Sequence, residues 1–314
     1  MSGSIAVITG PTATGKTALG VILAQYLNGE VVSADSMQVY RRMDIGTAKP
    51  TPEEMGGVPH YMIDVAEPWE SFSAARYVEE ATACVEDILA RGKLPLIVGG
   101  TGLYIDSLIM GRDFAAAPGD VRLRYELSVQ YDDLGGENFR RKLAEIDPVR
   151  AAKLSPGDKK RLVRALEVYL LTGKTITEHD EATKHLPPRY RAATIVLSYK
   201  DRENLYARID SRVDGMVRLG LVDEVCALLT GGLSRESTAM QAIGYKEIAR
   251  ALDGESPMDE AIALIKRESR RYAKRQLTWF RRNSGAFWIT WDEKPDFDFA
   301  RRSSTAFLSR YGIK

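Results

Sequence analysis

The sequence predicts an α/β protein in which helices flank a parallel sheet and an all-helical lobe is inserted into the chain. Two observations support this prediction. Over the first hundred residues, short apolar runs alternate with stretches of helical periodicity, which is typical of parallel strands joined by crossover helices. Between residues 115 and 188 the patterns are helical only, and a strand pattern then returns. We therefore expect an α/β core at 1–114 and 189–314, with the lobe at 115–188.

Local composition predicts the elements of the core in chain order. Runs of buried-strand composition, bounded by glycine or polar residues, predict strands at 4–9, 30–34, 94–98, 193–198 and 287–291. The first predicted helix carries Leu19, Ile22, Leu23 and Leu27 on one side. Apolar spacing predicts further helices at 73–91, 202–219, 221–229, 239–252 and 258–282. Helices should cover both faces of such a sheet.

The lobe differs from the core in its turn residues. Charged helical stretches alternate there with helix-breaking positions, namely Pro118, Gly135-Gly136, Pro148, Pro156-Gly157 and Pro187-Pro188. This pattern predicts several short helices and no strand.

Composition excludes several classes of protein. The chain has 314 residues, of which 44% are hydrophobic and 28% charged, as in ordinary globular proteins. No apolar run approaches the roughly 18 residues that cross a bilayer, so we expect no membrane partner. Cys84 and Cys226 are too few for a zinc site, and we expect no disulfide between them. These features favour a reducing, cytoplasmic location.

A phosphate-binding motif follows the first strand. It fits GxxxxGK[ST] and consists of Gly10, Pro11, Thr12, Ala13, Thr14, Gly15, Lys16 and Thr17. Glycines let backbone N–H groups turn toward an anion, and the following helix adds its positive N-terminus. Lys16 supplies a charge to the terminal phosphates, and the Thr17 hydroxyl is the predicted ligand of a Mg²⁺ cofactor. The sheet is therefore predicted to be P-loop NTPase-like.

The motif does not identify its ligand, because most P-loops bind ATP or GTP. An ordinary P-loop NTPase also needs an apolar strand that ends in an acidic metal partner. Asp35, after the second strand, is a candidate. The third strand ends instead in Gly99-Gly100-Thr101-Gly102, which offers no carboxylate. This departure makes an ordinary nucleotide hydrolase a weaker interpretation.

Six motifs occur in one order along nearly the whole chain. They are GPTATGKT at 10–17, DSMQVYR at 35–41, GGTGLY at 99–104, RLVRALE at 161–167, QAIGYKE at 241–247 and YAKRQLTWF at 272–280. In this order they resemble the tRNA dimethylallyltransferases (tRNA isopentenyltransferases) of the bacterial type. Any one motif would be modest evidence, and the six together are specific.

The resemblance implies a reaction. In that family the P-loop holds the pyrophosphate of dimethylallyl diphosphate, and the acceptor is the adenosine 3′ of the anticodon in tRNA. Its exocyclic amine attacks the allylic carbon and pyrophosphate leaves. The resemblance implies that Thr101 contacts the target nucleotide and that Arg212 or Arg208 reaches the diphosphate, with Arg212 preferred. The alternative for Thr101 is a helix cap.

Asp35 is the predicted general base of this reaction. Its place at the carboxyl end of a strand beside the P-loop is where open α/β sheets bind ligands. An adenine amine is a poor nucleophile, so a carboxylate should take its proton as the new bond forms. The alternative for Asp35 is a capping or metal-holding carboxylate.

The predicted tRNA contacts lie in several segments. Between Lys266 and Arg282, eight basic residues accompany one acid, Glu268, which favours binding to a phosphate backbone. The full set of predicted tRNA-binding residues is Asp35, Ser36, Met37, Gln38, Thr101, Arg122, Lys160, Arg161, Leu162, Val163, Arg164, Lys274 and Arg275. We expect the target adenine to be extruded, the lobe to clamp the anticodon stem-loop, and the protein to be monomeric.

Three alternatives stay open from the sequence alone. One is a kinase that uses the P-loop for ATP and acts on a small molecule. Another is a prenyltransferase that acts on free AMP, ADP or ATP. The third is a non-catalytic RNA-binding protein with a vestigial P-loop, against which the intact Lys16, Thr17 and Asp35 argue.

Overall fold

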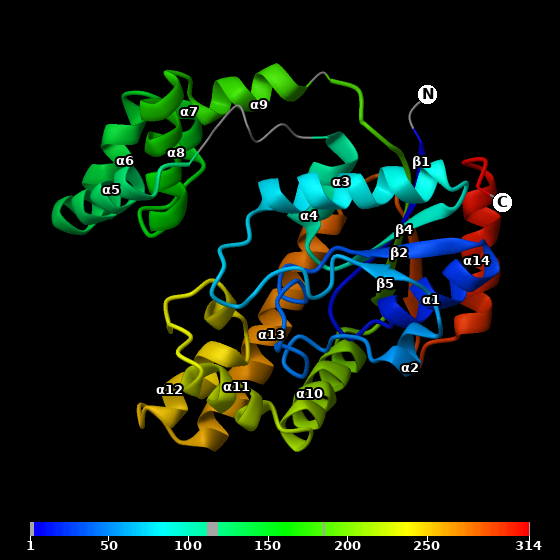
Figure 1. The fold of residues 1–314 in the computed structure, drawn as a ribbon. Helices are drawn as coiled ribbons and strands as arrows, with labels where there is room; N and C mark the ends of the chain where they lie inside the picture. The colour runs from blue at the N-terminus through cyan, green and yellow to red at the C-terminus, as the bar shows by residue number, and fades with distance from the viewer. Residues whose placement is uncertain (1–2, 112–118, 185, 314) are drawn as a thin grey trace. The chain divides into compact units, whose positions relative to one another are not determined.

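The structure is a computed structural model that describes residues 3–111, 119–184 and 186–313. It separates into two compact units, one formed by Met1–Gly111 with Pro188–Lys314 and the other by Arg112–Pro187 (Figure 1). The first unit is an α/β core and the second is a helical lobe. The predicted start of the lobe, Ala115, lies outside the described residues.

A single parallel sheet forms the centre of the core, in the strand order β3-β2-β4-β1-β5-β6 (Figure 1). The strands are β1 (Ser4–Thr9), β2 (Gly29–Ser33), β3 (His60–Tyr61), β4 (Leu94–Gly99), β5 (Arg191–Tyr199) and β6 (Phe287–Trp291). The predicted parallel, P-loop NTPase-like sheet is confirmed. The two-residue strand β3 was not predicted, because it is too short to show any periodicity.

The register of the sheet gathers three sequence motifs at one edge. Thr9 at the end of β1 pairs with Gly99 of β4, and Ser33 at the end of β2 pairs with Val98 of β4. Because all these strands are parallel, the residues that follow them meet at the carboxyl edge of the sheet. The P-loop, Asp35 and Thr101 are those following residues.

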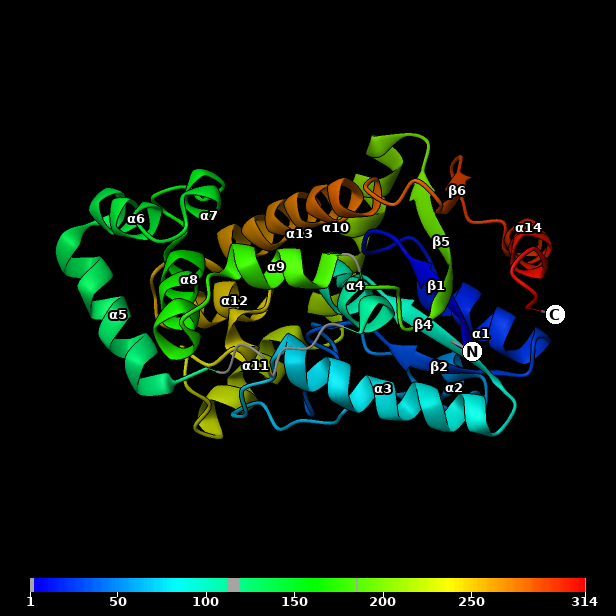
Figure 2. The same ribbon diagram turned by 90° about the horizontal axis from the view of Figure 1, so that it is seen from above.

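Nine helices accompany the described part of the core. They are α1 (Lys16–Tyr26), α2 (Pro52–Met55), α3 (Ala74–Ala90), α4 (Gly102–Met110), α10 (Arg202–Arg218), α11 (Leu221–Thr230), α12 (Tyr245–Leu252), α13 (Met258–Phe280) and α14 (Phe297–Ser309). The crossovers from β1 to β2, through α1, and from β3 to β4, through α3, run in opposite directions across the sheet. Right-handed crossovers therefore place α1 and α3 on opposite faces (Figure 2).

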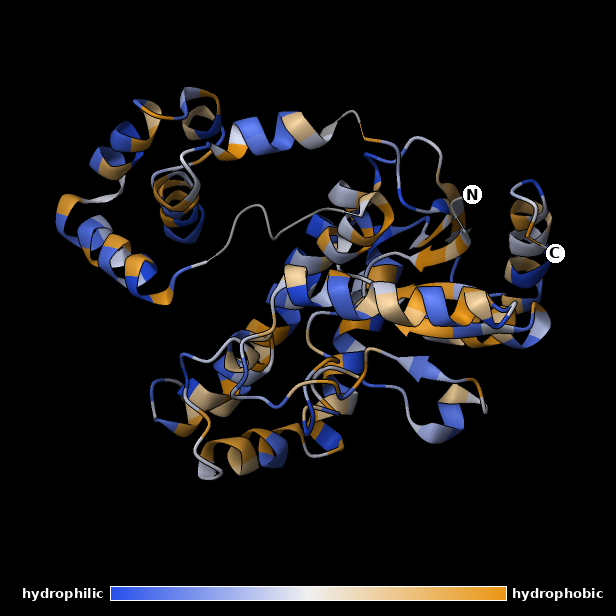
Figure 3. Ribbon diagram, turned by 45° about the horizontal axis from the view of Figure 1, so that its top comes forward, coloured by the Kyte–Doolittle hydropathy of each residue, from blue (hydrophilic) through white to orange (hydrophobic). Residues whose placement is uncertain are grey.

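The face that carries α1 holds a large apolar cluster. Leu19 and Leu23 of α1 pack there with Ile8 of β1, and Ala300 and Leu308 of α14 join the same cluster. These side chains are nearly inaccessible to water, so their burial supplies a main part of the driving force for folding. Figure 3 shows hydrophobic colour along the central strands and mixed colour on the helices that cover them.

The helices near the C-terminal end of the core also differ from the sequence prediction. The helix expected at 239–252 is broken into a short 3-10 turn (Ala239–Gln241) and α12, because Ala242 is extended and Gly244 has a φ of 101°. The helix α14 was not predicted, although Asp296 caps its start by accepting a hydrogen bond from the backbone N–H of Phe299 at 2.9 Å. That capping signal was present in the sequence.

The lobe consists of helices alone within its described residues. They are α5 (Val121–Leu134), α6 (Gly136–Ala144), α7 (Pro148–Ala152), α8 (Lys159–Thr172) and α9 (Ile176–Lys184). Its own apolar core contains Leu127, Phe139, Leu143, Leu162 and Leu166.

The buried Glu167 connects α5 and α8 inside the lobe. Its carboxylate accepts hydrogen bonds from Arg124 at 2.9 Å, from Arg164 at 2.7 Å and from the backbone N–H of Asp120 at 2.9 Å. Burial alone would raise the pKa of Glu167, but these hydrogen bonds lower it below the ordinary value. The side chain of Glu167 is 0% exposed.

We expect Glu167→Ala to destabilise the lobe by roughly 1–3 kcal/mol, because Arg124 and Arg164, which are partly exposed, lose the carboxylate that they share. Amide hydrogen exchange in α5 and α8 measures this effect. Glu126→Ala, which removes an exposed partner of Arg122, should change exchange little. Equal effects of the two variants would contradict the prediction.

Candidate active site

The P-loop is a rigid turn between β1 and α1. Gly10 has a φ of 140°, and a Cβ atom there would lie 2.2 Å from the carbonyl oxygen of Leu197, so no other residue fits. The Thr14 hydroxyl donates to the Pro11 carbonyl at 2.8 Å, and the Trp291 indole N–H donates to the Thr14 carbonyl at 2.9 Å. These contacts fix the loop at the N-terminus of α1, as a phosphate site requires.

Gln276 of α13 connects the P-loop to the turn after β4. Its carbonyl oxygen accepts the backbone N–H of Thr12 at 3.1 Å, and its amide donates to the Gly100 carbonyl at 2.9 Å. The side chain is buried. Gln276 was not among the predicted site residues. Its place in the motif at 272–280 was the only signal, and that signal did not indicate its partners.

Lys16 is held close to the P-loop backbone. Its ammonium donates to the Pro11 carbonyl at 2.7 Å. Burial and the positive charge of Arg212 lower the pKa of Lys16 to about 7, whereas the negative charge of Asp35 acts in the opposite direction. An anion bound here would stabilise the protonated form.

Two arginines of α10 also lie near the P-loop. Burial lowers the pKa of Arg212 below its ordinary value, and the negative charges of Asp35 and Glu54 oppose that shift. Arg208 donates from Nε to the Ala13 carbonyl at 3.3 Å. The structure therefore puts Arg212 within electrostatic reach of Lys16 and Asp35, and puts Arg208 in contact with Ala13 of the loop.

Asp35 follows β2 at the carboxyl edge of the sheet. Its Oδ1 accepts the backbone N–H groups of Met37 at 2.9 Å and Gln38 at 3.3 Å, which orients the carboxylate. Within the described part of the chain, Oδ2 accepts no hydrogen bond. One carboxylate oxygen thus serves the turn, as the capping alternative expects, and the other remains available for chemistry.

Thr101 lies beside the turn that Asp35 begins. Its hydroxyl oxygen accepts the backbone N–H of Ser36 at 3.0 Å. Thr101 occupies the N-cap position of α4 but its side chain makes no capping hydrogen bond to that helix. The alternative role of Thr101 as a helix cap is therefore wrong, because the hydroxyl faces the turn after β2 instead.

Tyr272 of α13 is a further neighbour of this group that the sequence prediction left out. Burial raises the pKa of its phenol to about 12 and the charge of Asp35 adds to the rise, whereas hydrogen bonds with Thr101 and Gln276 oppose it. Tyr272 is therefore a neutral hydroxyl next to Thr101. Its presence in the motif at 272–280 was the only sequence signal.

Several basic side chains of α13 form ion pairs within the protein, so fewer of them are available for RNA than the sequence suggests. Lys266 pairs with Asp214 at 2.6 Å, and Arg270 pairs with Asp210 at 2.5 Å. These acids come from α10, so the local count of eight bases to one acid overstated the free charge. Arg267 and Arg271 both pair with Glu268. The predicted RNA contacts Lys274 and Arg275 are exposed.

The predicted contacts in the lobe divide by exposure. Lys160 and Arg161 are exposed in the first turn of α8, and Arg122 is 91% exposed on α5. Leu162 and Val163 are buried in the apolar core of the lobe, so their side chains do not face solvent. Arg164 bonds to Glu167, as described above.

Three other properties of the described residues bear on function. Both thiols, Cys84 and Cys226, are free, as expected. Among the described residues, no three histidine, cysteine, aspartate or glutamate side chains are grouped to hold a metal ion. None of the described helices combines the length and apolarity that a membrane crossing requires.

A P-loop at the carboxyl edge of a parallel sheet, with an arginine and a carboxylate within electrostatic reach of its lysine, defines a P-loop α/β protein. A family model described as IPP transferase matches residues 38–283. The chain is 46% identical over 310 residues to the tRNA dimethylallyltransferase of Acetivibrio thermocellus, with 99% of each chain covered. It is 50% identical over 289 residues to that of Carboxydothermus hydrogenoformans, with 92% of each covered.

Solved structures agree with these sequence comparisons. The tRNA isopentenylpyrophosphate transferase of Bacillus halodurans is 44% identical, with a TM-score of 0.73 and coverage of 98% of this chain and 95% of that one. A eukaryotic dimethylallyltransferase acting on tRNA is 29% identical, with a TM-score of 0.84 and coverage of 98% and 80%. The chain belongs to the tRNA dimethylallyltransferase family and is an enzyme of that family. The predicted family is thus confirmed.

Proposed function

We propose that this protein transfers the dimethylallyl group of dimethylallyl diphosphate to the exocyclic amine of the adenosine 3′ of the anticodon in tRNA, releasing diphosphate. The observation that carries the proposal is the meeting of Lys16, Arg212 and Asp35 at one edge of the sheet. Two cations can stabilise the negative charge of a leaving diphosphate, and one carboxylate can accept the proton that the amine loses. We place the reaction in the cytoplasm and expect a monomer.

The reaction needs one bond to form and one to break. The amine nitrogen forms a bond to the allylic carbon, and the carbon–oxygen bond to diphosphate breaks with its electron pair leaving on oxygen. The amine proton passes to Oδ2 of Asp35. The P-loop N–H groups, Lys16 and Arg212 stabilise the charge that develops on the leaving diphosphate. Thr101 and Tyr272 offer hydroxyl groups to orient the acceptor base.

The residues near the P-loop fit the predicted Mg²⁺. The hydroxyl groups of Thr17 and Ser33 line one small hollow, together with Gln38, His60 and the apolar side chains of Val31, Pro50, Ile63 and Val98. Mg²⁺ prefers oxygen ligands, and it keeps several waters while binding substrate phosphates. The hydroxyl groups of Thr17 and Ser33 would hold the ion there. When bound, Mg²⁺ neutralises part of the charge on the diphosphate.

The acceptor is proposed to be tRNA on the strength of exposed basic residues in both units. Lys274 and Arg275 supply phosphate contacts in the core, and Lys160, Arg161 and Arg122 supply them in the lobe, which we propose grips the anticodon stem. Such contacts give affinity without sequence information. Specificity then requires an unpaired base, so the target adenine must leave the stack to reach Asp35.

The salt dependence of tRNA binding tests these contacts. We expect Lys160→Ala and Arg275→Ala each to reduce the slope of log K against log salt concentration by about 0.7–1, since each removes one phosphate contact. Lys266→Ala is the matched control on α13, because Lys266 pairs with Asp214 rather than facing solvent. An unchanged slope in Arg275→Ala, or an equal change in Lys266→Ala, would contradict the assignment.

A prenyl-transfer assay tests the function itself. It uses labelled dimethylallyl diphosphate, Mg²⁺ and unmodified tRNA, with AMP and ATP as parallel acceptors. Label entering tRNA supports the proposal. Label entering only a free nucleotide would identify a nucleotide prenyltransferase. Consumption of ATP without transfer of label would mean that the P-loop serves a kinase.

A further inference from the structure

Glu224 in the first turn of α11 binds three consecutive backbone N–H groups of a distant loop. Its Oε2 accepts from Asp44 at 2.7 Å and from Ile45 at 2.8 Å, and its Oε1 accepts from Gly46 at 3.0 Å. Three N–H donors that converge on one carboxylate form the kind of backbone nest that binds anions. A carboxylate with this many donors holds the loop far more firmly than a surface ion pair would.

Tyr245 completes this contact from α12. Its hydroxyl donates to Oε1 of Glu224 at 2.6 Å, and its ring is fully buried. The ring lies against Gly46, where a Cβ atom would come within 2.4 Å of it. The motif QAIGYKE, whose role the reaction itself does not explain, thus packs through Tyr245 on the loop at 44–46.

The same loop continues to the turn that carries Asp35. The Gln38 amide donates to the carbonyls of Thr47 and Ala48, at 3.2 Å each. The backbone N–H of Gln38 donates to Oδ1 of Asp35 at 3.3 Å. Gln38 therefore transmits the position of residues 44–48 to the proposed base.

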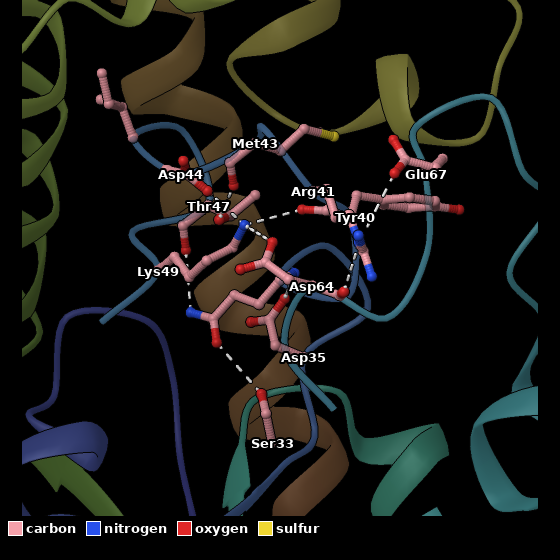
Figure 4. Close-up of polar contacts among 12 residues, drawn as sticks. Ser33, Asp35, Tyr40, Arg41, Met43, Asp44, Thr47, Lys49, Asp64 and Glu67 are labelled. Atoms are coloured by element: carbon pink, nitrogen blue, oxygen red, sulfur yellow. Dashed lines mark hydrogen bonds and ion pairs between the residues drawn. The ribbon is translucent and has the colours of Figure 1, made fainter. Parts of the chain in front are cut away.

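Lys49 also holds this loop, through three hydrogen bonds of its ammonium. Its ammonium donates to Asp44 at 2.5 Å, to Asp64 at 2.6 Å and to the Tyr40 carbonyl at 2.9 Å, as the centre of Figure 4 shows. Its side chain is only 6% exposed. Lys49 thus holds the loop through acidic side chains and a carbonyl, and Glu224 holds it through backbone N–H groups.

We propose that Glu224 is a positioning residue that connects the α11–α12 helices to the loop at 44–48 and thereby orients Ser36–Gln38 for the acceptor nucleotide. This inference rests on the proposed function. Glu224 acts through backbone contacts, so it affects acceptor binding and leaves the P-loop unchanged. Within the described part of the chain, the hydrogen bonds of Glu224 go to the loop at 44–46 and to Tyr245, none of which belongs to the P-loop.

The test replaces one oxygen of the carboxylate. In Glu224→Gln an amide NH₂ takes the place of one acceptor and faces N–H donors of the loop. We expect the amides of 44–46 to exchange with solvent at least about tenfold faster, since charge-assisted hydrogen bonds are lost. We also expect KM for tRNA to rise about tenfold, while the Kd of inorganic pyrophosphate stays within about twofold. Tyr245→Phe removes one hydrogen bond to Glu224. It should therefore raise both the exchange rate at 44–46 and KM for tRNA, but by less than Glu224→Gln does.

Asp223→Asn is the matched control, since Asp223 is an exposed acid in the same first turn of α11. It should leave exchange at 44–46 and KM for tRNA unchanged. Unchanged exchange in Glu224→Gln would overturn the inference. So would equal weakening of pyrophosphate and tRNA binding, which indicates a general loss of structure. If the wild-type protein prenylates no tRNA, the proposed function fails, and exchange at 44–46 together with tRNA binding still decides the role of Glu224.

Discussion

Asp35→Asn should lower kcat for prenyl transfer to tRNA by roughly 10²–10⁴-fold, the range expected when a general base is lost. The asparagine oxygen still accepts the N–H groups of Met37 and Gln38, so the turn after β2 is preserved. What is lost is an oxygen able to take the amine proton. Single-turnover transfer of labelled dimethylallyl groups measures the effect without interference from product release.

The Asp35→Ala variant separates the role of Asp35 as a general base from its role in holding the turn after β2. This variant loses the proton acceptor and also both hydrogen bonds to the turn. If Asp35 acts only by capping, asparagine should restore most of the activity that alanine loses. If Asp35 is the base, both variants should be similarly inactive. In either variant pyrophosphate should bind at least as tightly as in the wild type, because a negative charge near Lys16 and Arg212 has been removed.

The parts of the site that lie close together in the sequence were predictable. The P-loop is one contiguous motif with a strand before it and a helix after it, so its physics is local. Asp35 was predictable because it follows a strand of a parallel sheet, and parallel strands end at one edge. Thr101 follows another of these strands, but it was identified through the family resemblance. Neither prediction required knowledge of which helices cover the sheet.

Contacts between distant segments were not predictable in the same way. Gln276 bonds to Thr12 across 264 residues of sequence, and no periodicity indicates that pairing. The charge of α13 was overstated for the same reason, since Asp210 and Asp214 reach it from another helix. Charge patterns along one helix therefore predict a binding face only after its neighbours are known.

The break before α12 shows a third limit of prediction from the sequence, because apolar spacing does not detect an interruption within a helix. Apolar spacing continues through 239–252, so periodicity alone predicts one helix there. Gly244 carries a φ of 101°, and Tyr245 is then free to turn toward Glu224 and Gly46. A glycine inside a helical pattern was the available signal for this break.

Lys16→Met should weaken pyrophosphate binding at neutral pH by about 10–150-fold, the equivalent of about 1.5–3 kcal/mol for hydrogen bonds to a charged group. The ammonium is the only P-loop side chain that brings a positive charge to the anion. Lys16→Arg should retain most of the affinity. Isothermal titration with pyrophosphate measures all three proteins.

The affinity for pyrophosphate should also depend on pH, and the pKa of Lys16 determines the direction of that dependence. In the free protein the pKa of Lys16 is about 7, and a bound anion raises it. Below that pH the lysine is already charged, so its contribution to affinity is constant. Above it the free protein must take up a proton to bind, and log Kd should rise by about one for each pH unit. Lys16→Met removes this component, and comparison in the same buffers cancels the titration of pyrophosphate itself. A difference between wild type and Lys16→Met that stays constant between about pH 6 and about pH 9 would show that Lys16 does not titrate near neutrality.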